Sequence, residues 1–251
     1  MLNMRNEFLS VLGGLLSNAV AAKNGGRQGS VESRDVQVDS DKFTYQVYLP
    51  PEIQTDEKLP LIIYLHGINQ RGTGGVVPTT GAGGALVRHY LGQVPAIVLL
   101  PQCRSGSYWS DAVMERMVMQ EIEQTVEELG ADEKRIYLTG VSMGGYGVWF
   151  LASRHAGKFA ALVSLCGGSP FTKGDRFDSI VRGVGKTPAW LFHGADDKIV
   201  QVSESRQIVQ ALEANQGSVK YNEYPGVGHN VWLNALVEKD LLPWLLAQKL
   251  Q

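Results

Sequence analysis

Hydrophobic residues follow two different patterns along this chain. Residues 31–38 and 43–49 alternate apolar and polar positions, as half-buried antiparallel strands do, and Pro50-Pro51 ends the second of these segments. Further along, the apolar residues form short continuous runs, which are typical of strands buried on both faces of a parallel sheet. These runs are Leu61–Leu65, Ala96–Leu100, Ile136–Leu138, Ala161–Leu165 and Ala189–Phe192.

Segments with helical patterning separate most of these runs. We expect helices over Asp111–Leu129, Gly144–His155, Ser203–Asn215 and Val231–Lys249, and a last strand over Val219–Tyr224. Alternation of strands and helices predicts a mostly parallel, eight-stranded α/β sheet with helices on both faces.

The N-terminal segment allows two interpretations. Met1–Ala22 carries the apolar run Phe8–Leu16 and resembles a weak signal peptide, which would favour a location outside the cytoplasm. Its apolar residues also share one helical face, so a helix docked on the rest of the protein explains the pattern equally well. We therefore divide the chain into an N-terminal helix and linker (1–30) and an α/β domain (31–251).

Composition excludes several classes of function. The 251 residues carry a formal net charge of −2, which gives no electrostatic case for nucleic acid or for an anionic membrane. The N-terminal apolar run is too short to span a bilayer. The two cysteines, Cys103 and Cys166, are too few for a disulfide framework or a multi-cysteine zinc site. Whether they form one bridge or remain buried thiols stays open, and no metal or cofactor is expected.

The chemistry of such a sheet belongs at the carboxyl ends of its strands. Directly after one expected strand, Gly140-Val141-Ser142-Met143-Gly144 matches the pattern G-x-S-x-G, and a helix follows at once. This strand–turn–helix setting is what a nucleophile elbow requires, because the serine sits in a strained turn between residues that must be small. Ser142 is therefore the candidate nucleophile; the alternative is a glycine-rich turn with an inert serine.

A serine nucleophile needs a base, and the base needs an orienting carboxylate. In folds with this elbow the order along the chain is serine, acid, histidine. After Ser142 the acid candidates at a strand end are Asp196 and Asp197, and His229 follows them on a glycine-rich loop. The order therefore predicts His229 as the base and one of the two aspartates as the acid.

The other four histidines fit this role less well. His66 and His193 each precede a glycine at a strand end, where an imidazole usually braces a loop. His89 and His155 lie in or near segments with helical patterning and precede the acid.

Acyl transfer also needs donors for the oxyanion, usually two backbone N–H groups. The residue after the nucleophile, Met143, supplies one. The loop after the strand 61–65 is the expected source of the second, and the amide of Ile68, next to Gly67, is its candidate.

Several segments resemble known hydrolases. His193–Val200 is similar to the HGxxDxxV motif of many α/β-hydrolases, whose acid falls on Asp197, which makes Asp196 a loop-capping carboxylate. Leu65–Gly72 resembles the LHGxGxRG segment of phospholipase/carboxylesterase-type hydrolases, although Asn69 stands where glycine is frequent. Leu100–Cys103, followed by Trp109, resembles the bacterial "predicted peptidase" esterases.

The resemblance covers about residues 31 to 246 and implies an α/β-hydrolase fold. Members of the esterase group often carry an immunoglobulin-like domain ahead of the hydrolase domain. Residues 1–30 are too short for one, so the expectation is either a catalytic piece of a longer parent chain or a stand-alone member.

Substrate preference is inferred from what the sequence lacks. Only about 20 residues, 167–186, separate two strands where lipases insert a helical lid, so we expect no large lid and an open cleft. This favours a serine carboxylesterase acting on short-acyl or aryl esters. A serine peptidase, a feruloyl or acetyl-polysaccharide esterase, and a catalytically silent binding module are the alternatives. Residues placed to line a substrate pocket are Cys103, Tyr108, Trp109, Phe171 and Trp232.

Overall fold

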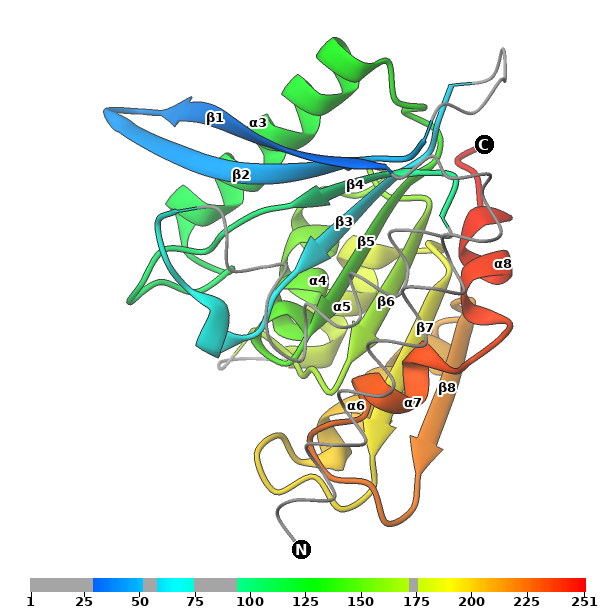
Figure 1. Ribbon diagram of the computed structural model, residues 1–251. Coiled ribbons are helices and arrows are strands. Elements are labelled where there is room, and N and C mark those ends of the chain that lie inside the picture. Colours follow the sequence, from blue (N-terminus) through cyan, green and yellow to red (C-terminus); the bar gives the residue numbers. More distant parts are fainter. Residues whose placement is uncertain (1–28, 52–57, 75–93, 172–175) are drawn as a thin grey trace, which may run out of the picture.

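The computed structural model describes residues 29–51, 58–74, 94–171 and 176–251. An eight-stranded sheet runs through it in the order β1-β2-β4-β3-β5-β6-β7-β8 (Figure 1). The strands from β4 onward in this order are mutually parallel, whereas β2 pairs antiparallel with both β1 and β4. The predicted α/β class and eight-stranded, mostly parallel sheet are confirmed.

Every predicted strand corresponds to an observed one. The antiparallel pair is β1 (Ser30–Val38) and β2 (Asp41–Leu49). The parallel strands are β3 (Leu61–Leu65), β4 (Ile97–Leu100), β5 (Ile136–Val141), β6 (Ala161–Leu165), β7 (Ala189–Gly194) and β8 (Val219–Tyr224).

The central strands are buried on both faces, which explains their continuous apolar runs. In β3, Leu61, Ile63 and Leu65 join the hydrophobic core on one face of the sheet. Ile62 and Tyr64 join a second core on the opposite face. Successive side chains of a strand point to opposite faces, so a strand between two cores needs an apolar residue at every position.

Four helices cover the first face (Figure 1). They are α3 (Ala112–Leu129), α4 (Met143–Arg154), α5 (Arg176–Val184) and α6 (Val202–Ala214). Three of them were predicted to within one residue at each end. Helix α5 was not predicted, although Phe177, Ile180, Val181 and Val184 have helical spacing, because the segment is short and Gly183 interrupts it.

The opposite face carries α7 (Trp232–Leu236) and α8 (Leu241–Leu246). The prediction of one continuous helix over Val231–Lys249 is wrong. Pro243 is the reason: its ring would clash with the carbonyl of Lys239 in a continuous helix, and it has no N–H to donate. The chain therefore starts a new helix at Leu241, which places Pro243 in a first turn where no intrahelical donor is needed.

Helix α5 lies in the connection between β6 and β7, where a lid would be inserted. Ile180 and Val184 are buried in the core beside α4 and α6, so the described part of this segment packs against the sheet layer and does not project as a lid. The expectation of no large lid holds for the described residues. None of the described helices is both long enough and apolar enough to cross a membrane.

The proposed N-terminal helix and most of the linker, residues 1–28, lie outside the described residues. The division into 1–30 and 31–251 therefore stays a prediction, as does the choice between a signal-like segment and a docked helix. The two cysteines are both buried free thiols, so they are not bridged to each other.

Candidate active site

Ser142 occupies a sharp turn between β5 and α4. Its backbone has φ 56° and ψ −117°, a conformation that non-glycine residues adopt at an energetic cost. The flanking glycines explain how the turn is accommodated. A Cβ on Gly140 would lie 2.3 Å from the carbonyl oxygen of Gly144, and a Cβ on Gly144 would lie 1.9 Å from that of Leu65. Only glycine fits either position, so the G-x-S-x-G spacing follows from packing.

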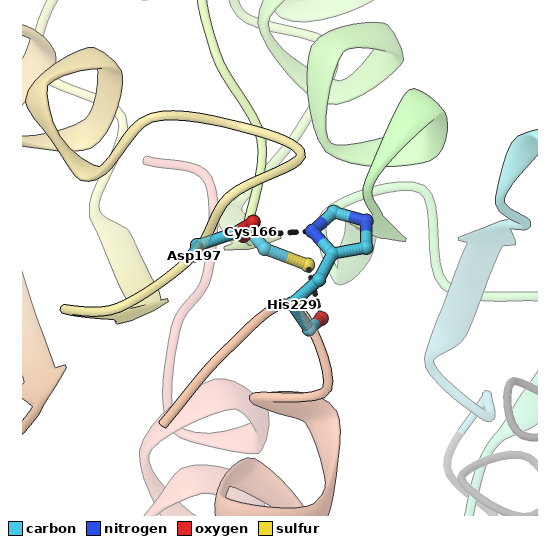
Figure 2. A group of neighbouring side chains, drawn as sticks. All are labelled: Cys166, Asp197 and His229. Carbon is cyan, nitrogen blue, oxygen red and sulfur yellow. Dashed lines mark hydrogen bonds and ion pairs between the residues drawn. The ribbon is translucent and has the colours of Figure 1, made fainter. Parts of the chain in front are cut away.

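Three side chains from separate loops form a continuous chain of hydrogen bonds. The Ser142 hydroxyl donates to Nε2 of His229 at 2.8 Å. Nδ1–H of His229 donates to Oδ2 of Asp197 at 2.7 Å. Figure 2 shows the second of these contacts, with the His229 ring directed toward Asp197. The structure thus brings together the three residues that the sequence singled out as nucleophile, base and acid.

Asp197 is held by several donors at once. Its side chain is fully buried, and its Oδ1 accepts the backbone N–H groups of Ile199 and Val200 at 2.8 and 3.0 Å. Burial raises the pKa of this carboxyl, but the hydrogen bonds from His229, Val200 and Ile199 outweigh it, and the net pKa is lowered. Asp197 is therefore ionised at neutral pH. Asp196 is exposed, and its backbone N–H bonds to the carbonyl of Val227.

His193 braces the acid loop, as predicted for a histidine at this place. The ring is fully buried. Since the carbonyl of Val200 can only accept, Nε2 of His193 carries the proton and donates to it at 3.0 Å. Nδ1 then accepts from the Ser205 hydroxyl at 2.7 Å. Burial lowers the pKa of His193, which keeps the ring neutral beside the ionised Asp197.

His66 braces the loop on the other side of Ser142. Its Nδ1–H donates to the carbonyl of Gly67 at 2.7 Å, and its Nε2 accepts the N–H of Cys103 at 3.1 Å. Burial lowers the pKa of His66 to about 4, so the ring is neutral in this arrangement. These contacts hold the loop in place, as predicted for His66.

The two candidate oxyanion donors are both first residues of helices. Met143 begins α4, and Ile68 begins the 3-10 turn Ile68–Gln70. The N–H groups at a helix start have no acceptor within the helix, so both remain available to a ligand. Gly67 lies against the nucleophile: a Cβ placed on it would be 3.7 Å from Cβ of Ser142. Arg71 steadies this turn by donating from its guanidinium to the carbonyls of Ile68 and Ser107.

Two of the residues predicted to line a substrate pocket do not do so. Cys103 and Trp109 are buried, with 0% and 1% of their surface exposed. Trp109 donates its indole N–H to the carbonyl of His66 at 3.0 Å and packs against Gly147 of α4, while Cys103 bonds to His66 through its backbone. They support the loop that precedes Ile68 and have no free surface with which to contact a substrate.

The remaining aromatic candidates differ in position. Trp232 lies edge-on to His229, with ring centroids 6.0 Å apart, so it borders the site. Phe171 packs against Phe150 of α4 and the core. Tyr108 is exposed and lies under the guanidinium of Arg71, 5.5 Å from the ring centre.

Cys166 is a neighbour of the site that the sequence did not assign to it. It directly follows β6, has φ 41°, and is fully buried. Its Sγ lies 3.5 Å from the carbonyl oxygen of His229. The signal available in the sequence was its place at a strand end, where the other site residues also lie.

The order of the strands and the serine turn between β5 and α4 define the protein as an α/β-hydrolase. Residues 109–239 match the phospholipase/carboxylesterase family. This match covers more than half of the chain, and the chain belongs to that family.

Solved structures extend the comparison. A thermostable esterase is 30% identical with a TM-score of 0.77, and the match covers 88% of this chain and 63% of that one. This chain thus spans less than two thirds of that esterase's length. An S-formylglutathione hydrolase of Staphylococcus aureus is 16% identical with a TM-score of 0.70, covering 88% and 97% of the two chains. An acylaminoacyl peptidase of Pyrococcus horikoshii is also 16% identical with a TM-score of 0.70, covering 89% and 42%. The last two likenesses show the fold alone.

Proposed function

We propose that this protein is a serine carboxylesterase that hydrolyses short-acyl or aryl carboxylic esters through an acyl-enzyme intermediate. The observation that carries the proposal is the unbroken hydrogen-bonded chain from the Ser142 hydroxyl through His229 to the buried carboxylate of Asp197. Ser142 is nucleophile, His229 general base and Asp197 the orienting acid. Ile68 and Met143 supply the oxyanion donors.

In the acylation step, Oγ of Ser142 attacks the ester carbonyl while its proton passes to Nε2 of His229. The carbonyl π electrons move to the oxygen, and the amides of Ile68 and Met143 stabilise the charge that develops there. The tetrahedral intermediate collapses, the alcohol leaves with the proton from His229, and Ser142 stays acylated. In the second step water, deprotonated by His229, releases the acid and restores Ser142.

Asp197 selects the reactive form of the base. By accepting the Nδ1 proton of His229, it leaves the lone pair of Nε2 facing Ser142. The ionised carboxylate then stabilises the imidazolium that forms during attack. Because two backbone amides also hold Oδ1, the carboxylate cannot rotate away from the ring without losing them.

The preference for short substrates rests on the direction of α5. Its apolar face is buried against the sheet layer, so the described part of this connection offers no apolar cover above Ser142 against which a long acyl chain would pack. Short acyl groups and aryl esters need less such surface. The half-buried Trp232 beside His229 is a candidate contact for an aromatic group.

The test pairs a substrate series with a nucleophile variant. The purified protein is assayed with p-nitrophenyl acetate, methyl ferulate and a chromogenic dipeptide, and its labelling by a fluorophosphonate probe is followed by mass spectrometry. We expect hydrolysis of an ester and one covalent label on Ser142. Ser142→Ala should lose label and activity, about 1000-fold or more in kcat, while Tm stays close to wild type.

Ser153→Ala is the matched control, since Ser153 lies at the far end of α4 and its hydroxyl donates to the carbonyl of Phe150 in the same helix. It should keep both label and activity. Cleavage of the dipeptide in preference to every ester would replace the proposal by a peptidase. Failure of all three substrates together with absence of the label would favour a silent binding module.

A further inference from the structure

Three potential metal ligands of different chemistry meet beside the nucleophile. The Sγ of Cys166, a carboxylate oxygen of Asp197 and a ring nitrogen of His229 all lie within 4.8 Å of one another (Figure 2). They come from three loops, after β6, β7 and β8, so the sheet itself holds them together. Asp197 and His229 belong to the proposed catalytic apparatus, whereas the thiol has no part in it.

The position of Cys166 is not explained by backbone requirements. Its φ of 41° is one that glycine adopts more easily, and two glycines follow it directly. The side chain is fully buried and lies on the side of Asp197 and His229. A cysteine here therefore adds a soft donor atom to a site that already has a carboxylate and an imidazole.

This set of donors matches the preferences of Zn²⁺ and of softer divalent ions such as Cd²⁺. Zn²⁺ binds thiolate at about 2.3 Å and imidazole or carboxylate at about 2.0–2.2 Å, usually with four ligands in a tetrahedron. Ligand atoms of such a site lie about 3.5 Å apart. The three atoms lie within 4.8 Å of one another, so side-chain rotations of modest size are needed to reach that distance, and a water molecule completes the fourth position.

Charge also favours a divalent ion. A thiolate and a carboxylate together carry two negative charges, which the ion neutralises, so the buried site is left without net charge. The second oxygen of Asp197 keeps its bonds to the amides of Ile199 and Val200, which hold the carboxylate in place.

We propose that Cys166, Asp197 and His229 form an inhibitory site for Zn²⁺ and Cd²⁺. Binding replaces the S–H bond of Cys166 by a metal–sulfur bond and releases that proton to solvent. At His229 the metal takes the lone pair of Nδ1, and the proton that Nδ1 carried moves to Nε2, so the ring stays neutral. An Nε2 that bears a proton cannot accept one from Ser142, and the base is thereby disabled.

The test measures binding and activity separately. Metal-free protein is titrated with CdCl₂ and ZnCl₂ by calorimetry, and p-nitrophenyl acetate hydrolysis is followed at the same metal concentrations, each variant relative to its own metal-free rate. We expect one ion bound per chain, inhibition that follows occupancy, and recovery with EDTA. MgCl₂, a hard cation with no preference for sulfur, should neither bind nor inhibit.

Two variants remove the thiol in different ways. Cys166→Ser keeps the size of the side chain, and Cys166→Gly suits the positive φ, so one remains informative if the other folds poorly. Both should raise the Cd²⁺ concentration for half inhibition by about 10- to 100-fold. Cys103→Ser is the matched control, because Cys103 is the other buried free thiol of the chain, and it should respond like wild type.

Equal sensitivity of wild type and both Cys166 variants would overturn the site, and so would protection by Cys103→Ser alone. The measurement of inhibition rests on the proposed esterase function, whereas the measurement of binding by calorimetry does not. If a protein without esterase activity binds one ion through Cys166, the proposed function is refuted and the metal site is supported. If an active esterase binds no Cd²⁺, the metal site is refuted and the proposed function is unaffected.

Discussion

His193 lies against the same carboxylate oxygen that binds His229. Its Nε2 is 3.3 Å from Oδ2 of Asp197, while Nδ1 of His229 is 2.7 Å from that oxygen. One carboxylate oxygen thus faces two imidazoles, one buried and neutral, the other half-buried and in contact with Ser142. His193 is a positioning residue in this arrangement, because it acts on the reaction only through Asp197.

Replacement of His193 should therefore affect catalysis without affecting substrate binding. His193→Gln loses part of the support of Asp197 and is expected to lower kcat by about 10- to 100-fold with little change in KM. Steady-state kinetics measures kcat and KM separately, and thermal unfolding of the variant is the control. A fall in activity that only follows the loss of folded protein would assign His193 a role in folding alone.

The two neighbouring aspartates provide a contrast for the acid. Asp197→Asn should reduce kcat by about 10⁴-fold, since the amide no longer selects the tautomer of His229 that faces Ser142. Asp196→Asn, at an exposed side chain that does not contact His229, should stay within about twofold of wild type. Parallel assays with p-nitrophenyl acetate give the comparison. The reverse order of losses would assign the acid to Asp196.

The buried His66 makes stability depend on pH. Its folded pKa of about 4 lies below the value of 6.5 for a free imidazole, so the unfolded state binds the proton more strongly. The contribution of neutral His66 to the free energy of unfolding is complete above pH 6.5 and is lost as the pH falls to about 4. At about 1.4 kcal/mol per pKa unit, the loss is at most about 3 kcal/mol.

His66→Gln and His66→Asn test this dependence, because each retains one of the two hydrogen-bonding positions of the ring. We expect the fall in the free energy of unfolding between pH 6.5 and 4 to be smaller in both variants than in wild type. Urea unfolding at four or five pH values measures it. A slope equal to that of wild type would mean that protonation of His66 is not coupled to unfolding.

Glu121 has the opposite pH dependence. Its carboxyl is fully buried in α3, and neither oxygen has a hydrogen-bond partner within the described part of the chain. Burial raises the pKa well above 4.5, so the folded state holds a proton that the unfolded state releases, and stability falls as the pH rises above 4.5. Glu121→Gln removes this dependence: its Tm should equal that of wild type near pH 5 and exceed it increasingly toward pH 8.

Glu123→Gln is the matched control for Glu121, since Glu123 is exposed two residues further along the same helix. Its Tm difference from wild type should stay small and constant across pH. If both variants behave alike, the burial of Glu121 has no effect on its titration.

The inward packing of α5 leads to a prediction about acyl length. We expect kcat/KM to peak at acyl chains of about two to six carbons, because longer chains find no apolar wall above the described part of the site. The rate should not jump when the substrate passes its solubility limit, since such a jump reports a lid that opens at an interface. A profile rising to sixteen-carbon esters would show that further residues cover Ser142.

Short-range patterns determined most of the architecture. Continuous apolar runs such as Leu61–Leu65 identified buried strands, because burial on both faces leaves no polar position within five residues. The glycines around Ser142 marked the turn because a Cβ at either would overlap backbone atoms. The order serine, acid, histidine then limited the candidates, and resemblance to a motif chose Asp197 over Asp196.

What only the tertiary structure decided depends on contacts between distant loops. Ser142 and His229 are 87 residues apart, and their hydrogen bond exists because parallel strands deliver both to one edge of the sheet. The same arrangement of strands buries Cys103 and Trp109, which the sequence predicted to line the pocket. It also brings the thiol of Cys166 beside Asp197 and His229. Hydrophobic periodicity indicates which face of its own helix or strand a residue occupies. Which loops meet, and which of their side chains remain accessible, follows from the pairing of strands across the whole chain.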